Sequence, residues 1–485
     1  MRSVLLSAIW LLAGCGAAAQ GASPKTSQSA SGVAVEDTST TSEAAVATTD
    51  EPTHASGTWI GASAESDLVL AGSDETTLGV WVDAPNLHTG IRPKVDLALV
   101  IDTSGSMAGV KIENARSAAR QLVQSLHDGD IVAIDTFSDD AHVLVPPTAI
   151  DATTRPRLLN AISQLRPAGS TNMFDGLSLG ESQTGRAPQT HAVRRLIMIS
   201  DGIANVGPSS PESLGVIAER GVRTGTQVTS LGVGIDYDEH TLNALAVRSS
   251  GRLYHLTEAT EMASILQREM DLLGSSVASD AFVEIVPAPG VQLVPVDGVR
   301  TEWGGSGTLR IPLGVLYGGQ HREALVRARF HGMSEPGGPK PLASVRLHFH
   351  DPSEGDLERV QEVVARVELT NDGAQVASHM NARTRSIVAI QDAAKLELAA
   401  AQSANAGQLG QADDALATAQ KKLKDEAGRT KDARERQRLS QVADSIGGAR
   451  KQTQAAAAAP APSRPAAVRA NALELNSSAM HANGY

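Results

Sequence analysis

Between residues 93 and 274 the sequence alternates short apolar runs with amphipathic stretches, and this alternation constrains the fold most strongly. The apolar runs predict strands, and stretches such as Gly109–Leu126 predict helices between them. Strands that alternate with helices form a doubly wound, mostly parallel sheet with helices on both faces. The predicted strands are Val95–Asp102, Ile131–Phe137, Arg195–Ser200, Gln227–Val233 and Arg252–His255, with a possible edge strand at His142–Val145.

Three polar segments stand at strand ends or helix starts of this predicted sheet: Asp102-Thr103-Ser104-Gly105-Ser106, Gly169-Ser170-Thr171-Asn172 and Ser200-Asp201-Gly202. The carboxyl ends of parallel strands meet at one edge, which is where ligands bind in open α/β sheets. We therefore expect five side chains to lie together there. All five offer only oxygen atoms, which favour Mg²⁺, with Mn²⁺ or Ca²⁺ as alternatives. They are Asp102, Ser104, Ser106, Thr171 and Asp201.

In this arrangement Asp102-x-Ser104-x-Ser106, Thr171 and Asp201 resemble the metal-ion-dependent adhesion site of the von Willebrand factor type A (VWA) family, in its bacterial form. The resemblance covers Val95–Glu258 and matches all five ligand positions. It implies binding of a protein partner that offers an acidic side chain to the metal. It also implies no catalysis by the domain itself.

The first 15 residues are typical of a targeting segment. Arg2 is followed by the apolar run Val4–Leu12 and then by Leu12-Ala13-Gly14-Cys15, which is similar to the lipobox of bacterial lipoproteins. Cys15 is the only cysteine, so the chain forms no internal disulfide. We expect lipidation at Cys15, which anchors the protein in the cell envelope, at the outer membrane or cell surface. A cleaved signal peptide with an incidental cysteine is the alternative.

The periodicity changes on both sides of the α/β segment. Residues 16–56 are rich in Ala, Ser and Thr and predict a disordered linker. Residues 275–370 alternate with period two and predict a β-sandwich-like domain, with β segments in 57–92 pairing to it, so that this domain is discontinuous. Residues 371–451 predict three helices, and residues 452–485, rich in Ala, Pro and Ser, predict a disordered tail.

Charge and motif content narrow the function classes. The formal net charge of −12 argues against a nucleic-acid partner. No histidine falls in the three polar segments to act as a base, so we expect no enzyme activity. His348 and His350 share one face of a predicted strand, but no third metal ligand accompanies them. Two hypotheses remain: a binding protein that grips its partner through the metal, and an envelope scaffold or assembly factor in which the metal only stabilises the fold.

Overall fold

The computed structural model describes residues 57–86, 92–188, 190–296, 299–330 and 337–484. The predicted signal peptide of residues 1–15, the lipidation site Cys15 and the linker of residues 16–56 lie outside the described residues. Within the described ranges, no helix combines the length and the apolar character that crossing a membrane requires.

A six-stranded sheet with the order β6-β5-β4-β7-β8-β9 forms the centre of the α/β domain. All neighbours pair in parallel except β5 and β6, which form an antiparallel hairpin at one edge. β4 is central and buried along its whole length, as expected for an apolar strand covered on both faces. The strands are β4 (Val95–Asp102), β5 (Ile131–Phe137), β6 (Ala141–Ala149), β7 (Val193–Ser200), β8 (Thr226–Val233) and β9 (Arg252–Leu256).

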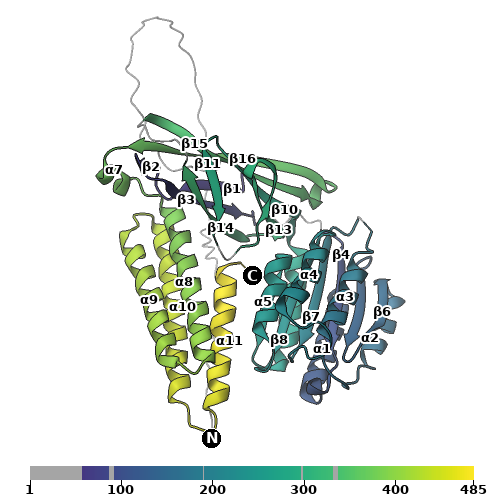
Figure 1. Ribbon diagram of the computed structural model, residues 1–485. Helices are drawn as coiled ribbons and strands as arrows, with labels where there is room; N and C mark the ends of the chain where they lie inside the picture. The colour runs from purple at the N-terminus through teal and green to yellow at the C-terminus, as the bar shows by residue number, and fades with distance from the viewer. Residues whose placement is uncertain (1–56, 87–91, 189, 297–298, 331–336, 485) are drawn as a thin grey trace, which may run out of the picture. The chain divides into compact units, whose positions relative to one another are not determined.

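Helices cover both faces of this sheet, which confirms the predicted fold class (Figure 1). One face packs against α1 (Val110–Ser125), α2 (Thr154–Ile162) and α6 (Met262–Gly274). The other packs against α3 (Met173–Thr184), α4 (Pro211–Val222) and α5 (Glu239–Ser249). Two single turns of 3₁₀ helix, η1 (Gly105–Met107) and η2 (Ala259–Glu261), precede α1 and α6.

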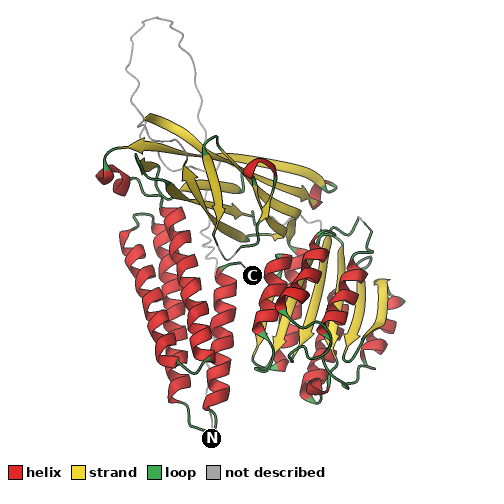
Figure 2. Ribbon diagram, in the orientation of Figure 1, coloured by secondary structure: helices red, strands yellow, loops and turns green. Residues whose placement is uncertain are grey.

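Two antiparallel-rich sheets form the second domain (Figure 2). Their apolar inner faces share one core. The smaller sheet has the order β1-β3-β14-β11: β1 (Ile60–Ala64), β3 (Glu75–Asp83), β14 (His321–Phe330) and β11 (Val291–Pro295). The larger has the order β12-β13-β10-β15-β16-β2: β12 (Glu302–Trp303), β13 (Leu309–Tyr317), β10 (Ser276–Pro287), β15 (Gly337–Asp351), β16 (Leu357–Thr370) and β2 (Leu68–Leu70). Two further turns of 3₁₀ helix are η3 (Gly305–Gly307) and η4 (Pro352–Glu354).

The pairing of β3 with β14 joins chain segments on either side of the α/β domain. Val80 faces Ala324 in this pairing, and Leu78 faces Val326. All four side chains are buried in the shared core. The second domain is therefore built from two separate parts of the chain, with the α/β domain inserted between them.

The C-terminal helical region consists of α7 (Gly373–Ser378), α8 (Ala382–Asn405), α9 (Leu409–Arg429), α10 (Ala433–Ala458) and α11 (Arg464–Ala482). Its long helices share a core of small and medium apolar side chains, among them Leu416, Leu423, Leu439 and Ile446. Ala-rich helices can approach closely because their side chains are short, which explains how a region almost without aromatic residues still forms a packed core.

The prediction of a disordered tail over residues 452–485 is wrong, because most of this segment is helical. α10 continues to Ala458, and α11 spans most of the remainder. α11 buries Leu473 and Met480 against the α/β domain and Leu475 in the helical core. Burial on two sides supplies the apolar contacts that the composition of the segment did not suggest.

Candidate metal centre

The first and third polar segments meet because β4 and β7 are parallel neighbours. Asp102 is the last residue of β4, and Asp201 directly follows β7. Ser200 donates a hydrogen bond from Oγ to Oδ2 of Asp102 over 2.7 Å. The strand pairing therefore places two buried carboxylates at one edge of the sheet.

The two serines of the first segment connect these carboxylates. The backbone N–H of Ser104 donates to Oδ1 of Asp102 over 2.8 Å. The Ser104 and Ser106 hydroxyls lie 3.0 Å apart, and the Ser106 hydroxyl donates to Oδ1 of Asp201 over 2.8 Å. Four of the five side chains predicted as metal ligands thus belong to one chain of hydrogen bonds.

Backbone hydrogen bonds hold the second polar segment against the first. The N–H of Gly105 donates to the carbonyl of Gly169 over 3.0 Å, and the N–H of Ala168 donates to the carbonyl of Thr103 over 2.7 Å. Gly169 has φ +79°, and a Cβ there would lie 2.6 Å from a carboxylate oxygen of Asp139. This tight left-handed turn therefore requires glycine.

Thr171 reaches the cluster from this second segment. Its N–H donates to Oδ1 of Asn205 over 2.9 Å, and its carbonyl accepts from the Asn205 N–H over 3.0 Å. A Cβ built on Gly202 would lie 3.5 Å from Oγ1 of Thr171 and 3.7 Å from Oγ of Ser106. The two hydroxyls therefore face the same small region beside Asp201. The structure brings all five predicted side chains to one edge.

Burial differs sharply across the cluster. Asp102 is 0% exposed and Asp201 is 1% exposed, whereas Ser106 is exposed. Burial raises the pKa of Asp102; hydrogen bonds from Ser104 and Ser200 oppose this rise, and the charge of Asp201 adds to it. Two carboxylates that share a buried corner repel each other and favour a nearby cation.

A lysine side chain lies close enough to offset part of this negative charge. The ammonium of Lys111, on the first turn of α1, donates to Oδ2 of Asp201. This residue was not among the sequence-predicted site residues. Its position five residues after Ser106, at the start of the predicted helix, was the available signal, because that spacing keeps it near the same sheet edge. With Lys111, the two carboxylates carry a net charge of −1.

The donor set fits a hard divalent cation. Two carboxylates and three hydroxyls are oxygen ligands of the kind that Mg²⁺ and Mn²⁺ prefer, and Asp102, Ser104, Ser106, Thr171 and Asp201 would hold such an ion. Bound there, the ion would supply an electron-poor centre for an incoming oxygen ligand. Across the described residues, no group of three or more His, Cys, Asp or Glu side chains could hold a metal, so a site here depends on the hydroxyls.

Asn172 has a different role from its neighbour Thr171. Its side chain accepts a hydrogen bond from the N–H of Asp175 over 3.2 Å and so caps α3. Its Nδ2 donates to Oδ2 of Asp175 over 2.8 Å. Ser200, which lies in the third polar segment, supports Asp102, and Asn205, three residues beyond that segment, supports Thr171. Neither residue was predicted to take part in the site.

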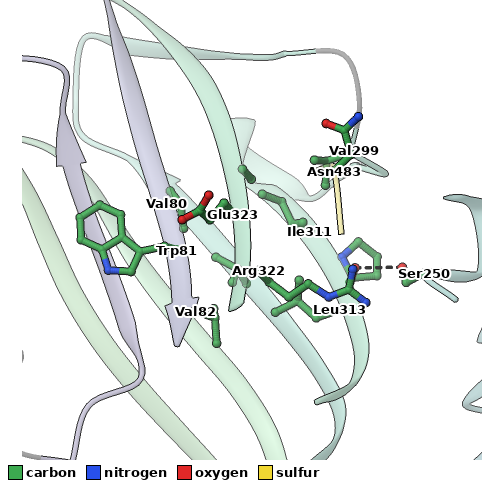
Figure 3. Close-up of a pocket in the computed structure, with 13 residues that line it drawn as sticks. Val80, Trp81, Val82, Ser250, Val299, Ile311, Leu313, Arg322, Glu323 and Asn483 are labelled. Carbon is green, nitrogen blue, oxygen red and sulfur yellow. Dashed lines mark hydrogen bonds between the residues drawn. The ribbon is translucent and has the colours of Figure 1, made fainter. Parts of the chain in front are cut away.

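Two cavities in the described part of the chain are lined by residues outside this cluster. Figure 3 shows one of about 30 Å³ beside Val80, Ile311 and Arg322, enough for roughly one water molecule. A larger cleft of about 680 Å³ is lined in part by His348 and Phe282. The two rings stack with centroids 4.5 Å apart, which gives His348 a packing role in place of a metal-binding one.

Comparisons with known proteins identify the domain that carries this cluster. Residues 96–268 match the von Willebrand factor type A domain. The chain is 29% identical over 217 residues to the uncharacterized protein YfbK of Escherichia coli (strain K12), covering 44% of this chain and 37% of that protein. It is also 29% identical over 184 residues to the human inter-alpha-trypsin inhibitor heavy chain H3, covering 35% and 20%. The chain thus spans well under half the length of these two relatives.

A solved structure extends the likeness beyond the α/β domain. The von Willebrand factor type A protein from Catenulispora acidiphila aligns with a TM-score of 0.68 and 17% identity, over 87% of this chain and 96% of that one. At this identity the alignment shows a shared fold and nothing about a shared ligand. Together with the match over residues 96–268, it confirms the prediction that this chain contains a von Willebrand factor type A domain.

Proposed function

We propose that the VWA domain binds a protein partner through a divalent cation held by Asp102, Ser104, Ser106, Thr171 and Asp201. Proteins with VWA domains commonly mediate protein–protein interaction. The observation that carries the proposal for this chain is the convergence of these five oxygen-bearing side chains at the carboxyl edge of the sheet, where Ser106 is exposed.

Charge balance favours an acidic ligand. The two carboxylates and Lys111 sum to −1, and a divalent ion brings the site to +1. A carboxylate from a partner would then neutralise the site and enter the shell of the ion. Hydroxyl ligands add no negative charge, so the ion keeps its attraction for this additional anion. Mg²⁺ is the proposed ion, and Mn²⁺ or Ca²⁺ could replace it.

The proposed role is binding without turnover, in the cell envelope. The described loops of the site contain no histidine that could serve as a general base. The lipobox-like sequence that ends in Cys15 supports a lipid anchor at the outer membrane or cell surface. The acidic composition supports a partner other than nucleic acid.

A scaffold role is the second candidate, and Lys111 favours it. Because its ammonium already offsets part of the charge of Asp201, the fold can form around the cluster before any metal binds. In that case a metal would stabilise the domain without changing its affinity for partners.

Metal binding is the first test, measured as Mn²⁺ titration followed by electron paramagnetic resonance. We expect one Mn²⁺ site in the full chain, which Mg²⁺ displaces and which Asp102→Ala abolishes. Asp140→Ala is the matched control, because it removes an exposed carboxylate near the site but outside the donor set. Equal Mn²⁺ binding by the wild type and Asp102→Ala would contradict the proposal.

Partner binding is the second test, measured as capture from envelope extract with Mg²⁺ or with EDTA. We expect capture only with Mg²⁺, and none by Asp102→Ala that retains its circular dichroism spectrum. A metal that raises the melting temperature while capture stays the same in EDTA would favour the scaffold role.

A further inference from the structure

Two large aliphatic side chains are exposed beside the oxygen cluster. Val110, the first residue of α1, is 69% exposed, and Ile203, two residues after Asp201, is 60% exposed. Of the large apolar side chains in the described parts of the chain, these two are the most exposed. A single exposed apolar residue is ordinary on a protein surface, whereas neighbouring ones can add apolar contact area for a ligand.

The ion pair of Lys111 with Asp201 links these two residues in space. Val110 immediately precedes Lys111, and Ile203 follows Asp201 and Gly202. The start of α1 and the loop after β7 therefore lie together, with one aliphatic side chain on each. We name Val110 and Ile203 the apolar rim of the site.

The fold does not need the apolar rim. α1 packs on the sheet through Ile112, Ala115 and Leu122, whereas Val110 lies outside this buried face. In the loop after β7, Ala204 is buried and its neighbour Ile203 is exposed. The rim therefore adds contact area for a ligand without taking part in the core.

We propose that the apolar rim selects a partner segment in which an acidic residue stands next to a large aliphatic residue. This inference rests on the proposed function, because the acidic residue is the one that enters the metal shell. The site with its ion carries +1 and takes the carboxylate. The aliphatic neighbour covers Val110 and Ile203 and removes apolar surface of both partners from water.

The experiment uses short fluorescent peptides with Gly/Ser flanks and the full chain, measured by anisotropy in Mg²⁺ and in EDTA. The peptides carry Asp-Leu, Asp-Ser or Asn-Leu at their centre. We expect Asp-Leu to bind roughly tenfold more tightly than Asp-Ser in Mg²⁺, and Asn-Leu not to bind. The double variant Val110→Ser/Ile203→Ser should reduce Asp-Leu binding to the level of Asp-Ser, while its Mn²⁺ affinity stays at the wild-type value.

A control variant and the failing outcomes separate this inference from the function on which it rests. Val216→Ser changes a valine that is 57% exposed on α4, outside the site loops, and should bind all peptides as the wild type does. Equal affinities for Asp-Leu and Asp-Ser would overturn the rim inference and leave the proposed function standing. Failure of both Asp peptides to bind in Mg²⁺ would overturn both. Binding of Asn-Leu in EDTA, or Mg²⁺-dependent self-association of the chain in sedimentation, would replace the proposed ligand with an apolar surface or a second copy.

Discussion

Two places at the carboxyl edge of the VWA sheet pair a buried carboxylate with a cation, and they differ in what completes them. After β7, Asp201 binds the ammonium of Lys111. After β8, Glu239 at the start of α5 binds the guanidinium of Arg469, which comes from α11. We call the second place the α11 junction.

The α11 junction is saturated by groups of the chain itself. Arg469 donates to the carbonyls of Ile235 and Tyr237 over 3.1 and 2.8 Å, and to Asn405 over 2.9 Å. It also contacts both carboxylate oxygens of Glu239, at 2.8 and 2.6 Å. Burial works to raise the pKa of Glu239, but the hydrogen bonds and charge of Arg469 outweigh it, so the pKa is lowered. All five donors of the guanidinium fork are thus directed at acceptors of the chain.

The oxygen cluster of the candidate metal centre has no comparable closure among the described residues. Lys111 offers a single compact charge to one oxygen of Asp201, and the remaining contacts are short-range bonds among hydroxyls and carboxylates. Those oxygens keep lone pairs that a cation can use. The difference teaches that the chain itself fills one strand end to fix the C-terminal helix, whereas the neighbouring strand end keeps oxygen atoms available for the proposed cation.

The largest expected effect comes from breaking the α11 junction. Arg469→Ala leaves the buried carboxylate of Glu239 without its cation, with the Asn405 amide still donating to Oε1 over 2.8 Å. Breaking a buried ion pair in this way costs about 3–5 kcal/mol of unfolding free energy. Urea denaturation measures the loss, and hydrogen exchange should show α11 amides losing protection first. Arg469→Lys keeps the positive charge but loses the planar guanidinium, so its unfolding free energy should lie between those of the wild type and Arg469→Ala. Unchanged protection of α11 in Arg469→Ala would show that the junction is not what holds this helix.

The α11 junction involves the part of the fold that the sequence pattern did not predict. The α/β domain was predictable because each strand is an apolar run between helices with one apolar stripe; the expected strand Ile131–Phe137 has the bounds of β5. α11 has no such stripe. It buries Leu473 and Met480 against the α/β domain and Leu475 in the helical core, so its apolar residues point in several directions. Without a single apolar stripe, its sequence looks like that of an unstructured segment rich in Ala, Pro and Ser.

The candidate site divides in the same way. Asp102, Ser106 and Asp201 could be assigned in advance because their spacing follows strand ends, and strand ends of a parallel sheet converge. The roles of Lys111 and Arg469 could not be assigned, since a lone cation in sequence does not reveal which distant carboxylate it will meet. Tertiary contact between residues 111 and 201, or 239 and 469, is set by packing and not by local pattern.

A third buried carboxylate, Asp135, extends the comparison, because no cation pairs with it among the described residues. Changing it should give the next largest effect on the unfolding free energy. Asp135 on β5 is fully buried, and neither of its carboxylate oxygens has a hydrogen-bond partner within the described part of the chain. Burial raises its pKa to about 7, with only the side chain of Gln183 opposing the shift. Between about pH 4 and pH 7 the folded state therefore holds a proton that the unfolded state has released, and the unfolding free energy falls as pH rises through this window.

Asp135→Asn should remove that pH dependence. We expect the variant to be more stable than the wild type at pH 8, by about 1–3 kcal/mol, and nearly equal to it at pH 4. Urea denaturation at the two pH values measures both differences. Asp74→Asn, at an exposed aspartate between β2 and β3, controls for the loss of one negative charge. A stability difference that stays constant from pH 4 to pH 8 would rule out Asp135 as the titrating group.

The smallest effect on stability, and the sharpest test of the open site, comes from Lys111→Met. Without metal we expect a loss of about 1 kcal/mol, because Lys111 makes a single contact with Asp201, which keeps its hydrogen bond from Ser106, whereas Arg469 makes five contacts. The affinity for metal should change in the opposite direction. Removing one positive charge next to the ion should tighten Mn²⁺ binding about three- to tenfold. The same change lowers the net charge of the loaded site from +1 to 0, so affinity for an acidic peptide should fall. Lys111→Arg keeps the charge and should match the wild type in both measurements. If Lys111→Met bound Mn²⁺ and peptide with wild-type affinity, Lys111 would belong to the fold alone, and the site would owe its preference for an anion to the metal.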